Sequence, residues 1–116
     1  MGYTNYWNQP TDFTNEEWDW LCEYFKEVRD AAGDNISLDA LYDDPKENEI
    51  IIFDGGKGGT SERFVLEKKV KTEPDYEGQD LAFNFCKTRK YPYDFYVKAV
   101  LMYCTLIKSD FSYSHD

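Results

Sequence analysis

The sequence contains few of the residues from which small catalytic and metal sites are usually built. Its one histidine, His115, is next to the last residue, and its three cysteines, Cys22, Cys86 and Cys104, form no CxxC pair. Chain ends fray in solution, which argues against a mechanism that needs a fixed imidazole. The sequence also offers no His/Cys set for a metal. We therefore expect no cofactor, and the pattern leans away from an enzyme.

Long apolar runs are also missing. No stretch approaches the roughly 20 apolar residues that span a bilayer. The first ten residues, MGYTNYWNQP, lack the cationic and apolar regions of a signal peptide. An odd number of widely spaced cysteines suits a reducing compartment. Together these absences predict a cytoplasmic protein with no membrane partner.

Positive charge is scarce in the first half of the chain. Residues 1–62 carry 15 acids against 4 bases, residues 63–116 carry 8 against 9, and the net charge is −10. Nucleic-acid binding needs clustered cations to neutralise phosphates, so direct binding of nucleic acid is not expected. The acidic half suits a basic protein partner or mimicry of nucleic acid, and it equally suits plain solubility.

Aromatic residues are abundant, at 18% of 116 residues, and the sequence also has clear signals for helices. Rings bury a large area each, so residues 1–116 can form one small domain. Thr14 and Glu17 have the spacing of a capping box, and apolar residues follow at helical spacing until Gly33. A second helix is predicted over residues 92–108, with apolar residues on most sides.

Strand patterns account for most of the remaining chain. They cover residues 3–7, 49–53, 62–69, 81–87 and 110–113. Residues 35–42 favour a further strand, with a loop containing a helical turn as the alternative. The glycine-rich stretch 54–61, DGGKGGTS, joins two strands into a hairpin. The order β-α-β-β-β-β-α-β predicts an α+β fold of two layers, with two helices on one face of a mainly antiparallel sheet.

The densest positive charge lies between the strand ending near residue 87 and the helix that begins near Pro92. Lys87, Thr88 and Lys90 fall in this segment, and Asp94 follows in the first helical turn. Free amides at a helix N-terminus attract anions, and nearby cations and hydroxyls strengthen the attraction. The segment is therefore either an anion pocket or a basic loop that forms salt bridges with the acidic first helix.

Three blocks of the sequence resemble a widespread small-domain family with bacterial, fungal and viral members. GYTNYW, IIFDG followed by ERF, and FNFCKTRKYPYDFYVKAVL are similar to the family patterns GYTHYW, FNG…HExF and FCKTxxKPYDxxV. This chain differs in having Asp54 where the family has Asn, Ser61 where it has His, and Tyr91 as an extra residue before Pro92. The resemblance implies a shared fold and a shared site rather than a particular activity.

The family blocks also suggest which residues converge at one end of the sheet. An aromatic wall, a cationic floor and a few hydrogen-bonding groups suit a small phosphorylated ligand that carries a base. The predicted ligand-binding residues are Tyr6, Trp7, Asp54, Glu62, Lys87, Thr88, Lys90, Tyr93 and Asp94.

Three functions remain open from the sequence. The first is non-enzymatic binding or sequestration of a nucleotide-like ligand, for example as a phage-type anti-defence sponge. The second is an acidic inhibitor or nucleic-acid mimic whose helix 16–30 faces a basic host protein. The third is a small metal-dependent hydrolase that uses Asp54, Glu62 or Asp94. A homo-oligomer is possible under any of them.

Overall fold

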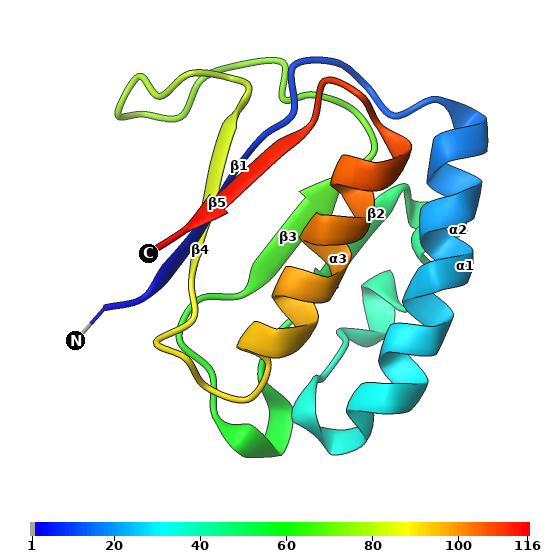
Figure 1. The fold of residues 1–116 in the computed structure, drawn as a ribbon, viewed down its shortest axis with the longest axis vertical. Helices are drawn as coiled ribbons and strands as arrows, with labels where there is room; N and C mark the ends of the chain where they lie inside the picture. The colour runs from blue at the N-terminus through cyan, green and yellow to red at the C-terminus, as the bar shows by residue number, and fades with distance from the viewer. Residues whose placement is uncertain (1) are drawn as a thin grey trace.

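The computed structural model describes residues 2–116, and its strands form two separate antiparallel sheets. One sheet has the order β4-β1-β5, formed by β4 (Phe83–Lys87), β1 (Thr4–Asn8) and β5 (Ser112–His115). The other is the hairpin of β2 (Ile50–Phe53) and β3 (Phe64–Glu67). Figure 1 shows the two long helices side by side, with α3 in front of β2 and the three-stranded sheet to the left of α3. The predicted α+β class is confirmed, with the strands divided between two sheets.

The helices follow the signals in the sequence. Helix α1 (Asn15–Ala32) begins at the predicted capping box, in which Glu17 N donates to Thr14 Oγ1 at 3.0 Å and Thr14 N donates to Glu17 Oε1 at 2.8 Å. Removing such a cap typically costs about 1 kcal/mol. Helix α3 (Asp94–Ile107) forms inside the predicted range, and α2 (Pro45–Asn48) is a single short turn. None of the helices in residues 2–116 has both the length and the apolar character needed to cross a membrane.

Aromatic rings join the helices to both sheets. The Phe25 ring of α1 stacks on Phe53 of β2, with centroids 5.7 Å apart. Phe53 also contacts Phe64 of β3, whose ring lies 5.4 Å from that of Trp7 in the other sheet. These four rings are all buried. The core is therefore continuous beneath both sheets, although no strand pairing among residues 2–116 connects them.

Residues 35–42 form no strand. Their only strand-like pairing is one bridge, in which Ser37 and Asp54 exchange main-chain hydrogen bonds of 3.0 Å. The Asp39 side chain then caps a 3₁₀ turn over Ala40–Tyr42. The alternative prediction, a loop with a helical turn, describes this region, in which Asp39 caps the turn and Ile36 is the one β-branched residue.

Candidate functional site

The segment predicted as an anion pocket contains a buried hydrogen-bond network centred on Asp94. Its Oδ1 accepts from Thr88 Oγ1 at 2.5 Å and from Asn5 Nδ2 at 2.7 Å, and its Oδ2 accepts from Lys98 Nζ at 2.7 Å. Thr88 is 0% exposed and Asp94 is 7% exposed. The network joins the start of α3 to the central strand β1, and it occupies the Thr88 hydroxyl and the Asp94 carboxylate.

Opposing effects set the ionisation of this network. Burial alone would raise the pKa of Asp94, but hydrogen bonds from Lys98, Thr88 and Asn5 outweigh it and hold that pKa below its usual value. Burial would likewise lower the pKa of Lys98, whereas its bonds to Asp94 and Tyr3 leave the pKa raised. The pair is therefore ionised at neutral pH, and its charges compensate each other.

A second group of predicted residues joins the β2–β3 connection to the segment between β4 and α3. The Tyr93 hydroxyl donates to Glu62 O at 2.6 Å and accepts from Ser61 N at 3.1 Å. Glu62 Oε1 accepts from Lys87 N at 2.7 Å. The Lys87 and Lys90 side chains are exposed, and Lys90 Nζ lies 4.8 Å from the centroid of the Tyr3 ring. Tyr93 and Glu62 thus hold the loop in place, while the two cations remain at its surface.

The remaining predicted residues are more dispersed. The Tyr6 hydroxyl donates to Asp116 Oδ1 at 3.0 Å, and its ring stacks on Phe83 with centroids 6.1 Å apart. Asp54 Oδ1 accepts from Gly56 N at 3.2 Å within the glycine-rich turn. Of the nine predicted residues, only Trp7 lines the cleft between β3 and β4 that is described next.

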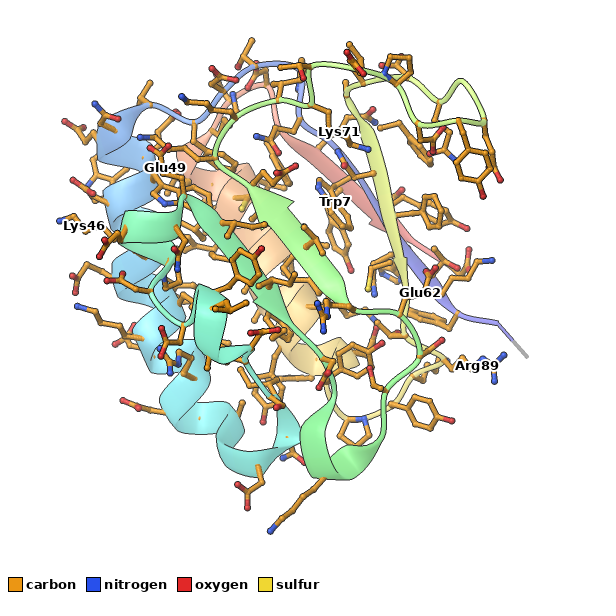
Figure 2. The ribbon with its side chains drawn as sticks, turned by 180° about the vertical axis from the view of Figure 1, so that it is seen from behind. Trp7, Lys46, Glu49, Glu62, Lys71 and Arg89 are labelled. Carbon is orange, nitrogen blue, oxygen red and sulfur yellow. The ribbon has the colours of Figure 1, made fainter. Side chains whose placement is uncertain are left out.

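This cleft lies where the edges of the two sheets face each other. At one end Glu62 N donates to Lys87 O at 2.8 Å, and at the other Gln9 Nε2 donates to Glu67 O at 2.9 Å. The space between them is about 290 Å³. Figure 2 shows Trp7 between β3 and β4, with Lys71 toward one end of the gap and Glu62 toward the other.

Main-chain groups of both strands point into this gap. In an antiparallel sheet the N–H and C=O of alternate residues face opposite neighbours. The main-chain N–H and C=O of Lys87 both form hydrogen bonds with Glu62, on the side away from β1. Phe85 lies two residues earlier, so its main-chain groups also point away from β1. The main-chain N–H of Lys68 donates to Glu49 O, on the β2 side. Val65 is three residues earlier, so by the same alternation its main-chain groups point away from β2. The cleft therefore presents main-chain donors and acceptors from both sides.

The Trp7 side chain carries a buried donor without a partner. Its Nε1 is the one buried side-chain nitrogen or oxygen of residues 2–116 without a hydrogen-bond partner. The other buried tryptophan, Trp18, donates its Nε1 to Pro45 O at 3.0 Å. A buried donor without an acceptor costs about 1–3 kcal/mol. Trp7 itself lines the cleft.

Three cations line the cleft, namely Arg63, Lys69 and Lys71. Within residues 2–116 none of them forms an ion pair with a carboxylate, and Lys71 Nζ lies 3.4 Å from Phe83 O. Glu67 and Asp75 also line the cleft, and neither side chain has an ion pair within the same residues. The lining therefore has three cations against two carboxylates.

The sequence-based prediction missed these cations. The alternation in residues 62–69 places Arg63, Glu67 and Lys69 on the same side of a strand, and that signal was available. Lys71 follows in an irregular segment that has no motif. The neighbour that makes these residues a site, β4, begins more than ten residues later, so only the fold brings the cations together.

No group of three or more His, Cys, Asp or Glu side chains within residues 2–116 is arranged to hold a metal ion.

Compared with protein-family models, curated proteins and solved structures, the chain matches none. The resemblance to the small-domain family stays a prediction.

Proposed function

We propose that the protein binds a small phosphorylated, nucleotide-like ligand in the cleft between β3 and β4 and does not convert it. The observation that carries this proposal is the cleft lining, in which three cations without ion pairs lie near Trp7, whose buried N–H has no acceptor. In a chain of net charge −10, a lining with three cations against two carboxylates favours an anionic ligand.

Each part of such a ligand has complementary groups in the lining. Arg63, Lys69 and Lys71 suit phosphate oxygens, and arginine can bind them through two parallel hydrogen bonds. The Phe85 ring is 37% exposed and offers a stacking face to a base. Asn84, whose amide nitrogen donates to Ala82 O at 3.0 Å, keeps its side-chain oxygen for a donor on the ligand.

The lining also supports binding rather than turnover. It consists of aromatic, aliphatic, amide and charged side chains, and it includes no histidine, cysteine, serine or threonine. Such groups hold a ligand, and no hydroxyl, thiol or imidazole lies among them to act as a nucleophile. A volume near 290 Å³ is at the lower end of the range for ligand pockets, so we propose a small ligand. A cytoplasmic sponge of the phage type, which removes a host nucleotide signal, is the biological setting we propose.

The experiment is thermal unfolding of the protein with a panel of linear and cyclic nucleotides. A ligand at a hundredfold excess over its Kd adds about 2.7 kcal/mol of stability, which raises Tm by several degrees in a domain of this size. We expect at least one nucleotide to do so and to be recovered unchanged. No shift with any nucleotide contradicts the proposal.

Three variants locate the site. Lys71→Ala should abolish the shift, because Lys71 lines the cleft. Lys46→Ala, which removes a cation that pairs with Asp19 at 3.7 Å on the helical side, is the matched control and should keep it. Lys87→Ala tests the loop predicted from the sequence and should also keep the shift. If the Tm shift is lost in Lys87→Ala but kept in Lys71→Ala, the ligand binds at the segment between β4 and α3 rather than in the cleft.

A further inference from the structure

Helix α3 carries a row of exposed apolar side chains on the side away from the sheets. Phe95, Met102 and Leu106 are 71%, 58% and 82% exposed. Their spacing of seven and four residues places them on one face of the helix. Single exposed apolar residues are common, whereas an aligned group marks a surface that another molecule covers.

Helix α1 extends this surface. Tyr24 of α1 stacks on Tyr103 of α3, with ring centroids 4.2 Å apart and planes within 5° of parallel. Trp20, one turn before Tyr24, is 46% exposed. Figure 1 shows the two helices side by side, so the stacked tyrosines connect the apolar rows of both. We call this surface the α1–α3 face. It consists of Trp20, Tyr24, Phe95, Met102, Tyr103 and Leu106.

Negative charge borders the α1–α3 face. Glu16, Glu23 and Glu27 are exposed and are spaced seven and four residues apart on α1, in the same stripe as Trp20. Glu23 and Glu27 line a groove with Trp20 and both tyrosines. The cation of that groove, Lys26, already pairs with Glu23 at 3.1 Å. The border therefore keeps a net negative charge.

We propose that the α1–α3 face is a docking surface for a basic amphipathic helix of another protein. Apolar anchors on such a helix would cover the row on α3, and its lysines or arginines would face the glutamates of α1, as in helix-in-groove recognition. A second copy of this chain is a poorer occupant, because a symmetric dimer repeats the same acidic patch on both partners. The proposal does not depend on the cleft ligand, since it uses the opposite side of the molecule.

The test uses a synthetic 18-residue amphipathic peptide with leucines on one face and lysines on the other. A twin with glutamate in place of every lysine is its control. We expect the lysine peptide to bind in fluorescence anisotropy, with affinity that falls as salt is added. The glutamate twin should bind at least tenfold more weakly. Equal binding of both peptides, or no binding of the lysine peptide, would overturn the proposal.

Variants place the peptide on the face. Leu106→Asp and the double variant Glu23→Lys, Glu27→Lys should each weaken binding at least tenfold, because one removes an anchor and the other reverses the charge. Leu41→Asp is the matched control, since Leu41 is 75% exposed but lies in the 3₁₀ turn Ala40–Tyr42, outside the α1–α3 face. The Leu41→Asp variant should bind the peptide as tightly as the unaltered protein does. All substituted positions are exposed, and an unchanged Tm shows that each variant folds. If Leu106→Asp binds the peptide as tightly as the unaltered protein, the assignment is contradicted. A stable dimer in sedimentation that the peptide cannot disrupt would contradict it as well.

Discussion

The side-chain amide of Asn5 donates a hydrogen bond of 2.7 Å to the carboxylate of Asp94, 89 positions further along the chain. Both side chains are buried, and the bond connects the central strand β1 to the first turn of α3. Thr88 and Lys98 complete the coordination of the same carboxylate. A carboxylate therefore holds the basic segment between β4 and α3 against the central strand.

Asp94→Asn should make the protein less sensitive to acid. Burial opposes ionisation of Asp94, but hydrogen bonds from Lys98, Thr88 and Asn5 still hold its pKa below the usual value. A carboxyl group whose pKa is lower in the folded state stabilises the fold above its unfolded pKa of about 3.9. That contribution is lost as pH falls from there through the folded pKa. The variant should be less stable at pH 7 by about 1.5–3 kcal/mol, because a hydrogen bond to a charged group is weakened.

Urea unfolding from pH 7 to pH 2.5 measures this effect. The difference between the variant and the unaltered protein should shrink below pH 4. Asp43→Asn is the control, because the exposed Asp43 side chain makes no ion pair within residues 2–116. A constant difference across the whole pH range would show that the Asp94 charge does not stabilise the fold.

Gly55→Ala should strongly destabilise the hairpin between β2 and β3. A Cβ atom at Gly55 would lie 1.7 Å from Gly59 O and 2.9 Å from the Tyr93 ring. The main chain of the glycine-rich turn would have to move, so we expect a loss of several kcal/mol, as for other overpacked sites. Gly2→Ala is the matched control, since nothing lies within 4 Å of the added atom. Equal Tm values for the two variants would contradict the tight packing of this turn.

The three cysteines should react slowly with a thiol reagent in the folded protein. Burial, followed by the charge of Asp19, raises the pKa of Cys22 to about 11, and burial raises that of Cys86 to about 12. Burial also raises the pKa of Cys104. Because the thiolate is the reactive form, at pH 8 the folded chain should react far more slowly than the chain unfolded in urea, in which all three react. Rapid reaction of any one cysteine without denaturant would show that its environment is more open.

Local signals in the sequence predict much of this fold. The capping box at Thr14 and the apolar spacing after it place α1 correctly, because both interactions lie within one turn of the chain. The alternation of β-branched and aromatic residues places four of the five strands, and the last one lies two residues later than predicted. Division of the strands into two sheets depends on pairing between distant segments, which no local pattern reveals.

The site is harder to predict than the fold for the same reason. Lys87 and Lys90 mark a clear basic segment, but the segment does not show that Asn5 and Lys98 bind the carboxylate of Asp94. Arg63, Lys69 and Lys71 are unremarkable in sequence and become neighbours of Trp7 only when β3 faces β4. Of the nine residues predicted to bind a ligand, Trp7 belongs to the cleft, and its role there stays a prediction.

The most direct test of the proposed cleft site follows the indole N–H of Trp7 by ¹⁵N NMR during a nucleotide titration. The chain has three tryptophans, so three indole signals are expected, and Trp7→Phe identifies one of them. Trp18 already donates to Pro45 O, and Trp20 is exposed on the far side, so both serve as internal controls. A nucleotide that stabilises the protein should shift the Trp7 signal and leave the other two in place. A stabilising nucleotide that leaves Trp7 unmoved while the amides of residues 87–94 shift would contradict binding in the cleft.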